Sequence, residues 1–153
     1  MSWEALASWR ARQTGRVVFT NGVFDLLHPG HVDVLVSARG CGNVLVVGVN
    51  SDASVKRLKG PARPIRSEGE RVYVLAALEA VDAVTVFEQD TPLELVRVLQ
   101  PNVIVKGGDY SPDTVVGATE VRARGGEVVI VPLTPGHSTT STIHRLRGRP
   151  DTA

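Results

Sequence analysis

The hydrophobic positions along the chain follow two alternating patterns. Five short runs are almost continuously apolar, at residues 17–20, 43–49, 83–87, 103–106 and 127–132. Such runs are typical of strands buried on both faces of a sheet. Helical patterns lie between and after them, at residues 30–39, 68–78, 92–99, 114–124 and 140–146. A short helix is also predicted at residues 2–13, capped by Ser2 and ended by Gly15, and Ser67 and Glu70 have the spacing of a capping box.

Strands that alternate with helices predict a parallel sheet, because each helix carries the chain back to the edge where the last strand began. We therefore expect a single α/β domain, a Rossmann-like three-layer sandwich around a five-stranded, mainly parallel sheet. The domain is expected to span residues 1–147, with a flexible tail at residues 148–153. Ligands of such folds bind outside the carboxyl ends of the strands, near the switch point of the sheet.

The bulk composition narrows the class of protein. The chain has 153 residues, 42% of them hydrophobic and 22% charged, which fits one globular domain with its own core. A formal net charge of +1 provides no overall field that would attract nucleic acid or a membrane surface. The one cysteine, Cys41, excludes an internal disulfide and fits a reducing compartment. Residues 1–15 contain charges and no long apolar run, so we expect neither signal peptide nor membrane anchor, and a cytoplasmic protein.

The tetrad His28-Pro29-Gly30-His31 is the most informative motif. It follows the first predicted strand and opens a helix, so both imidazoles should lie on one side of the first helical turn. The free N–H groups and partial positive charge of a helix N-terminus favour phosphate, and Gly30 leaves room for a ligand. A helix cap beside a surface histidine explains an isolated tetrad equally well. A zinc site is disfavoured, because His137 and His144 come without cysteines or carboxylates at ligand spacing.

A run of hydroxyl side chains at residues 138–142 opens the last predicted helix. Plain N-capping would be the better explanation of this run in isolation. The alternative is a second anion site, made of hydroxyls and helix N–H groups. Two such helix starts in one small parallel fold would point to the same edge of the sheet, and this favours a shared phosphate site.

A basic segment follows the second predicted strand. Its cations are Lys56, Arg57, Lys59, Arg63 and Arg66, and Gly60, Pro61 and Pro64 predict a loop. We interpret the segment as a mobile flap that brings cations to an anionic substrate, with a solvated basic loop as the alternative. Arg71 lies in the first turn of the next helix, where the helix dipole disfavours a cation, and this suggests an anionic partner.

Two further segments carry candidate ligand contacts. Lys106 and Asp109 flank two glycines after the fourth predicted strand, where a ligand could approach closely and Asp109 could accept a sugar or ribose hydroxyl. A tight turn is equally consistent. Asp25 precedes the tetrad and could orient Asn21 or a histidine, contact a metal ion, or pack within its loop.

Together these segments resemble the HxGH nucleotidyltransferase superfamily, through residues 20–25, 28–31 and 138–140. Within it the chain is most similar to the D-glycero-β-D-manno-heptose 1-phosphate adenylyltransferases, through residues 50–60, 90–95 and 106–110. The similarity runs from about residue 16 to residue 147. It implies transfer of an adenylyl group from ATP to a sugar 1-phosphate, which gives ADP-heptose and pyrophosphate for lipopolysaccharide or another surface polysaccharide.

The resemblance also implies roles for single residues. His28, His31 and Lys59 would be catalytic and contact the triphosphate and the transferred phosphoryl group. The nucleotide would be bound by Thr20, Asn21, Gly22, Phe24, Gly30, Arg71, Lys106, Gly108, Asp109, Ser138, Thr139 and Thr140. Of these, Lys106 and Asp109 would help frame the nucleotide or the sugar. The acceptor would contact Asp25, Lys56, Lys59 and Arg63. Mg²⁺ is expected to be held mainly by the phosphates of ATP, and no protein ligand is named for it.

Two departures from the family pattern leave alternatives open. In many bacteria this activity is one half of a bifunctional enzyme with a sugar kinase, whereas this chain resembles the stand-alone form. Leu133 replaces an arginine of the related glycerol-3-phosphate cytidylyltransferases, which weakens but keeps the alternative of a cytidylyltransferase for a polyol phosphate. A non-catalytic nucleotide-binding sensor is the alternative from another class. Relatives commonly self-associate, so a homo-oligomer, most simply a dimer, is expected, with no nucleic-acid or membrane partner.

Overall fold

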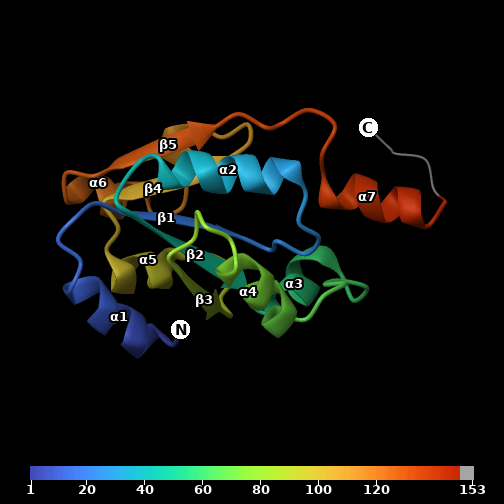
Figure 1. Cartoon of the computed structure of the whole chain (residues 1–153), viewed down its shortest axis with the longest axis horizontal. Coiled ribbons are helices and arrows are strands. Elements are labelled where there is room, and N and C mark those ends of the chain that lie inside the picture. The colour runs from blue at the N-terminus through green and yellow to red at the C-terminus, as the bar shows by residue number, and fades with distance from the viewer. Residues whose placement is uncertain (149–153) are drawn as a thin grey trace.

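A parallel sheet with the strand order β3-β2-β1-β4-β5 forms the middle layer of the protein (Figure 1). The computed structural model describes residues 1–148. The strands are β1 (Val17–Gly22), β2 (Val44–Asn50), β3 (Ala83–Phe87), β4 (Val103–Gly107) and β5 (Glu127–Val131). All neighbouring strands pair in parallel, so the predicted fold class is confirmed. The switch point lies between β1 and β4, on either side of which the chain proceeds in opposite directions across the sheet.

Helices cover both faces of this sheet (Figure 1). The helices are α1 (Trp3–Ala11), α2 (Pro29–Arg39), α3 (Asp52–Lys59), α4 (Glu68–Ala76), α5 (Leu93–Leu99), the 3₁₀ turn η1 (Pro112–Thr114), α6 (Ala118–Ala123) and α7 (Thr139–Leu146). Helix α7 covers neither face and lies beyond the end of the sheet, at the right of Figure 1. One apolar cluster joins β2 Val46 to α1, α5 and α6, and a second joins its neighbours Leu45 and Val47 to α2 and α4. Successive residues of a strand point to opposite faces, so a strand buried on both sides must be apolar throughout.

Two predicted elements differ from the structure. The predicted loop after β2 is wrong in its first part, because residues 52–59 form helix α3. The Ser51 hydroxyl accepts a hydrogen bond from the Ser54 N–H, and Lys56, Arg57 and Lys59 lie in the last turn, where the helix dipole favours cations. The predicted helix at residues 114–124 begins only at Ala118, because Gly117 has a φ of +90°.

Local helix signals were read correctly elsewhere. The capping box is confirmed, since the Ser67 hydroxyl accepts from the Glu70 N–H and the Glu70 carboxylate accepts from the Ser67 N–H. Within residues 1–148, no helix is long and apolar enough to cross a membrane. Of the predicted tail at residues 148–153, only Gly148 belongs to the described part of the chain.

Candidate active site

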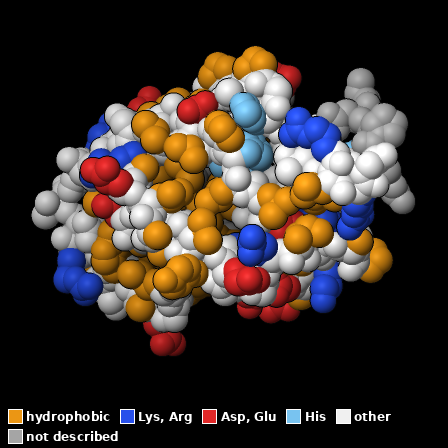
Figure 2. Space-filling view, turned by 45° about the vertical axis from the view of Figure 1, so that its right-hand side comes forward, with side chains coloured by type: hydrophobic (Ala, Val, Ile, Leu, Met, Phe, Trp, Pro, Cys, Tyr) orange, Lys and Arg blue, Asp and Glu red, His pale blue; other side chains and the backbone are white. Residues whose placement is uncertain are grey.

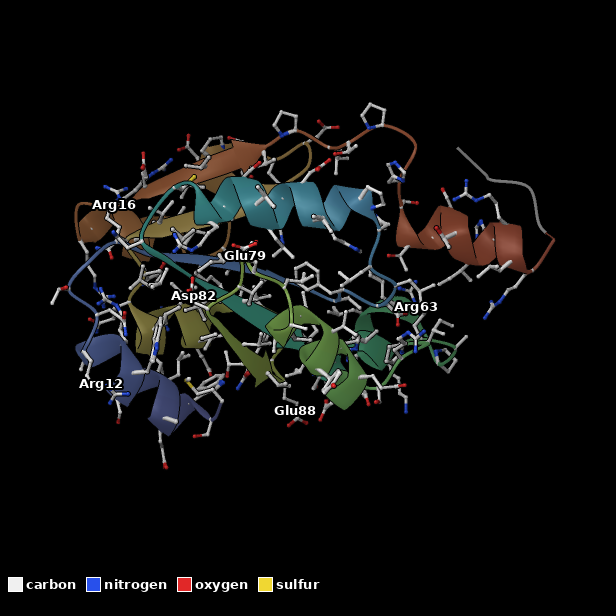
Figure 3. The ribbon with its side chains drawn as sticks, viewed as in Figure 1. Arg12, Arg16, Arg63, Glu79, Asp82 and Glu88 are labelled. Atoms are coloured by element: carbon white, nitrogen blue, oxygen red, sulfur yellow. The ribbon has the colours of Figure 1, made fainter. Side chains whose placement is uncertain are left out.

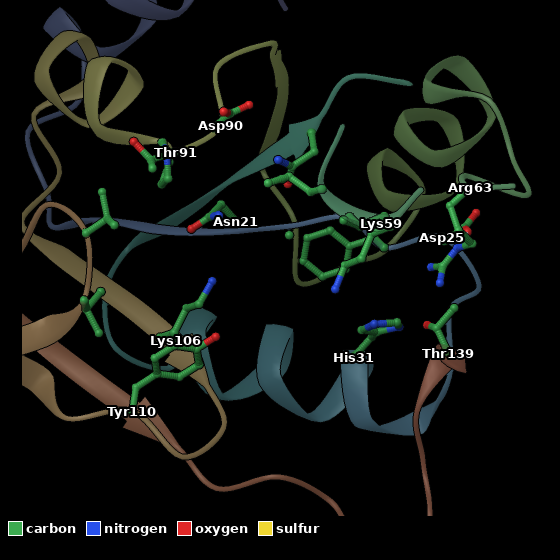
Figure 4. A pocket seen from close by; sticks show the side chains of 18 of the residues that line it. Asn21, Asp25, His31, Lys59, Arg63, Asp90, Thr91, Lys106, Tyr110 and Thr139 are labelled. Atoms are coloured by element: carbon green, nitrogen blue, oxygen red, sulfur yellow. Dashed lines mark hydrogen bonds and ion pairs between the residues drawn. The ribbon is translucent and has the colours of Figure 1, made fainter. Parts of the chain in front are cut away.

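A polar cleft opens at the carboxyl ends of β1, β2 and β4, beside the switch point (Figure 4). It has two adjoining lobes, a larger lobe of about 500 Å³ and a smaller lobe of about 300 Å³. The two lobes share Asn21, Gly22, Val23, Phe24, His31, Lys106 and Thr139. These shared residues mark a junction at which ligands in the two lobes would meet.

Two stacked imidazoles stand at the N-terminus of α2. The rings of His28 and His31 are 3.8 Å apart between centroids and inclined by 21°. The Nδ1 atom of His31 accepts a hydrogen bond of 3.3 Å from the backbone N–H of His28. A nitrogen that accepts carries no proton in the neutral ring, so the proton of His31 lies on Nε2, which is left as a donor. The bond therefore fixes both the tautomer and the orientation of His31.

Gly30 and His137 complete the packing of this pair. A Cβ atom on Gly30 would lie 2.9 Å from Cε1 of His28, so a larger residue would push the ring away. His137 adds a third ring, 6.1 Å from His28 between centroids and inclined by 18°. Figure 2 shows histidine side chains gathered on one face of the molecule. His137 is not among the residues predicted to bind phosphate. Its place directly before the hydroxyl run was the available signal.

The hydroxyl run lines the same cleft, and Figure 4 shows Thr139 beside His31 on one side of the cavity. Ser138 caps α7 by accepting from the Ser141 N–H, as the capping interpretation predicts. Thr139 donates its hydroxyl to the Leu26 carbonyl at 3.3 Å and lines both lobes, while Thr140 lines the larger lobe. The N-termini of α2 and α7 thus converge on one cleft, which gives it two sources of N–H groups and partial positive charge.

His28 and His31 are neutral near pH 7. Burial, followed by the charge of His28, lowers the pKa of His31 to about 4. Burial and His137 lower the pKa of His28 in the same direction. Neutral imidazoles can donate a hydrogen bond to phosphate but add no charge. Positive charge in the cleft therefore has to come from other side chains.

We expect the lowered pKa of His31 to make stability depend on pH. Between pH 6.5 and about 4 the unfolded chain binds a proton at His31 that the folded protein does not, so stability falls as the pH falls through this range. From pH 7 to pH 5, the free energy of unfolding of the wild type should drop by roughly 1–2 kcal/mol more than that of His31→Gln. Urea denaturation of both proteins at the two pH values measures this difference, and equal drops would show that His31 titrates normally.

Two lysines carry positive charge into the larger lobe from opposite sides (Figure 4). Lys59 is the last residue of α3, and Lys106 lies near the end of β4. The ammonium of Lys106 lies 5.4 Å from the centre of the Tyr110 ring. Burial, and then the charge of Lys59, lower the pKa of Lys106.

Asp25 anchors the connection between α3 and α4. Its side chain is 0% exposed and accepts from Arg63 Nε at 2.7 Å, and its oxygens accept from the backbone N–H groups of Ile65 and Arg66 at 2.9 Å each. Burial raises the pKa of Asp25, but these hydrogen bonds outweigh burial and the net pKa is lowered. The carboxylate already has its partners, so we assign Asp25 a positioning role in place of the predicted direct contact with the acceptor. Arg63 lines the larger lobe beside it.

Arg71 is also placed differently from the prediction. Its side chain is 0% exposed, and it lines neither lobe. The guanidinium donates to the carbonyls of Val23 and Asn50 and to the Asp52 carboxylate, each at 2.8 Å. Asp52 is thus the anionic partner that the position of Arg71 suggested, and the role of Arg71 is to join the ends of β1 and β2 to α3 rather than to contact phosphate.

Some of the remaining predicted site residues line the cleft and others do not. The smaller lobe is lined by Thr20, His28, Gly30 and Ser138 as well as by the shared residues. Lys56, Gly108 and Asp109 line neither lobe, and the side chains of Lys56 and Asp109 face solvent. Several residues of the larger lobe are not among the predicted site residues, namely Asn50, Leu58, Asp90, Thr91, Pro92, Tyr110, Thr114, Val115 and Val116. Residues 90–92 and Tyr110 belong to segments that carried the resemblance, and this was the signal for them.

The described residues assemble no metal centre of their own. Within residues 1–148, no three His, Cys, Asp or Glu side chains gather in a way that could hold a metal ion. The donors of the cleft are mainly N–H groups, hydroxyls and lysines, which suit phosphate oxygens. This set fits a Mg²⁺ ion that keeps phosphate oxygens and water as its ligands.

The fold and the cleft define an α/β protein with a polar cleft at the switch point of a parallel sheet. The chain belongs to the cytidylyltransferase-like family, whose family model matches residues 19–145. The family-level resemblance read from the motifs is therefore confirmed.

The chain is also similar to individual curated proteins of this family. The chain is 59% identical over 140 residues to the bifunctional protein HldE of Rhodopseudomonas palustris (strain BisB18), covering 92% of this chain and 28% of that protein. It is 59% identical over 146 residues to HldE of Nitrobacter hamburgensis (strain DSM 10229), covering 95% of this chain and 30% of the relative. The chain thus spans less than a third of the length of these curated relatives.

Two solved structures have folds similar to that of this chain. The crystal structure of the lipopolysaccharide core biosynthesis protein from Thermoplasma volcanium GSS1 superposes with a TM-score of 0.63 at 30% identity, covering 78% of this chain and 97% of that one. Pantoate-beta-alanine ligase from Francisella tularensis has a TM-score of 0.64 at 13% identity, covering 95% of this chain and 75% of that one, and shows the same fold.

Proposed function

We propose that the protein transfers an adenylyl group from ATP to a sugar 1-phosphate, D-glycero-β-D-manno-heptose 1-phosphate, and forms ADP-heptose and pyrophosphate. The observation that carries the proposal is the convergence of the His28–His31 pair and the α7 N-terminus on one cleft, with a second polar lobe beside it. The choice of adenylyl donor and heptose acceptor is supported by the motif resemblance and by the 59% identity to HldE.

The chemistry needs no general base. The attacking group is a phosphate oxygen of the acceptor, and the second pKa of a phosphate monoester is about 6, so this oxygen is already anionic near pH 7. It forms a bond to the α-phosphorus of the nucleotide, while the bond from that phosphorus to the bridging oxygen of the β-phosphate breaks and pyrophosphate leaves. Catalysis then consists of positioning two polyanions and stabilising the charge that develops.

The residues of the cleft suit these tasks. His31 lines both lobes, so its Nε2–H would donate to an oxygen of the α-phosphate at their junction. Thr139, Thr140 and the N-terminus of α7 would bind the β- and γ-phosphates. Lys59 would approach from α3 and stabilise charge on the transferred group. Bound Mg²⁺ would shield the charge of the triphosphate.

The larger lobe suits a polyhydroxylated acceptor. Asn21, Asp90 and Thr91 provide side chains that can exchange hydrogen bonds with sugar hydroxyls. Asp90 is held by an ion pair of 3.1 Å with Arg57, which fixes its orientation at the rim.

In the smaller lobe, the apolar Leu133 lies where cytidylyltransferases for glycerol 3-phosphate carry an arginine.

A screen for pyrophosphate release tests the proposal. ATP, CTP and GTP are each combined with heptose 1-phosphate, other sugar 1-phosphates and glycerol 3-phosphate. We expect release with ATP and a sugar 1-phosphate, and an ADP-sugar as the second product. Release only with CTP and a polyol phosphate would instead favour the cytidylyltransferase. Nucleotide binding without release from any pair would favour a sensor.

A cytoplasmic location and a dimer remain predictions, which fractionation and light scattering would test.

A further inference from the structure

We propose that Lys106 binds the phosphate of the acceptor. Lys106 and Lys59 together form a binding site with two positive charges, which selects phosphorylated acceptors. The proposal rests on the proposed function and narrows the place of Lys106, which the resemblance left at the nucleotide or the sugar, to the phosphate of the second substrate. Three observations support it: the charge balance of the cleft, the direction of the Lys106 ammonium, and the place that the reaction requires for the acceptor phosphate.

The charge balance of the larger lobe leaves both lysines uncompensated. Its acidic residues are Asp25 and Asp90, and each already pairs with an arginine, Arg63 at 2.7 Å and Arg57 at 3.1 Å respectively. Among residues 1–148, no carboxylate lies within ion-pair distance of Lys59 or Lys106. Keeping a half-buried ammonium beside a second one costs free energy, and an anionic ligand would offset this cost.

The ammonium of Lys106 is directed toward the larger lobe. Lys106 lines both lobes, but its ammonium lies over the ring of Tyr110, which lines only the larger lobe. The nearby cation that lowers its pKa is Lys59, which also lines only the larger lobe. Figure 4 shows the two side chains entering the cavity from opposite sides.

The reaction itself locates the acceptor phosphate. This phosphate carries the attacking oxygen, so it must lie next to the α-phosphate, at the junction of the two lobes. His31 and Lys106 are the ionisable side chains common to both lobes. Neutral His31 can donate a hydrogen bond without adding charge, whereas Lys106 brings the positive charge that a phosphate dianion requires.

The kinetic test compares Lys106→Met with Lys106→Arg and with Arg12→Met. Arg12 is exposed and lies at the end of the molecule away from Arg63 and the cleft (Figure 3). We expect Lys106→Met to raise the KM for the sugar 1-phosphate roughly 10- to 100-fold and the KM for ATP by less than about threefold. Lys106→Arg should recover part of the loss, and Arg12→Met should match the wild type. A rise confined to the KM for ATP, or no rise in either, would overturn the assignment.

A labelling test needs no variant and no turnover. The lysines of the chain are Lys56, Lys59 and Lys106. The folded protein is acetylated with an uncharged, amine-reactive reagent, and peptide mass spectrometry then measures the modification of each lysine. A hexose 1-phosphate alone should protect Lys106 at least several-fold, while exposed Lys56 serves as the internal reference. Protection only by a non-hydrolysable ATP analogue, or by neither ligand, would contradict the proposal. Protection by the sugar phosphate in a protein that releases no pyrophosphate would overturn the proposed function alone.

Discussion

His31→Ala is expected to lower kcat by roughly 10²- to 10⁴-fold, because it removes the N–H donor held at the junction of the two lobes. The hydrogen bond from the His28 N–H to Nδ1 fixes that donor, and stacking on His28 fixes the ring plane. The loss should appear in kcat more than in the KM for ATP, because the bond strengthens as charge develops on the α-phosphoryl group. Initial rates of pyrophosphate release measure it.

The matched control is His144→Ala, since His144 is a histidine on α7 that lines neither lobe. This variant should keep the wild-type rate. Urea denaturation separates loss of function from loss of fold, and we expect His31→Ala to remain folded at the assay temperature. A folded His31→Ala protein with the wild-type kcat would remove the role assigned to His31.

Arg71→Met is expected to lower the free energy of unfolding by roughly 2–4 kcal/mol, the largest stability effect predicted here. The substitution keeps most of the apolar stem but leaves the Val23 and Asn50 carbonyls and the Asp52 carboxylate without their donor. These acceptors lie where β1 and β2 end, so the cleft should loosen as well. Urea unfolding curves measure the effect.

Arg66→Met is the control for this prediction. Its side chain is 55% exposed and pairs at 3.6 Å with Glu70 in the first turn of α4, so its removal should change stability by no more than about 0.5 kcal/mol. If Arg71→Met instead kept its stability and raised only the KM for ATP, Arg71 would be the phosphate contact that the resemblance implied.

The fold was largely predictable because its main signal is local. Buried parallel strands must be apolar on both faces, and runs such as residues 43–49 and 83–87 have no other simple explanation. Gly60, Pro61 and Pro64 predict a loop for the whole basic segment, whereas its first part forms helix α3. They mark only its end, where Gly60 has a φ of +99° after Lys59. The N-cap at Ser51 was the overlooked local signal.

The site was predictable where a motif fixes the local backbone geometry. It was less predictable where contacts between distant segments determine whether a side chain lines the cleft. The tetrad at residues 28–31 had to open a helix at the carboxyl edge of β1, and it does. Spacing along the chain did not show that Arg71 is buried against Asp52, or that Asp25 is enclosed by the backbone of residues 65–66. Cations in a basic segment look alike in sequence, but the fold places Lys59 on the wall of the cleft and leaves Lys56 outside it.

The most direct test of the account is a crystal structure of the protein with α,β-methylene-ATP, which cannot be cleaved at the α–β bridge. The account predicts that the triphosphate lies between the Nε2 atom of His31 and the N-terminus of α7, with the α-phosphate at the junction of the lobes and the larger lobe left open for the acceptor. A triphosphate bound elsewhere, or one that contacts only one of these two helix N-termini, would contradict it.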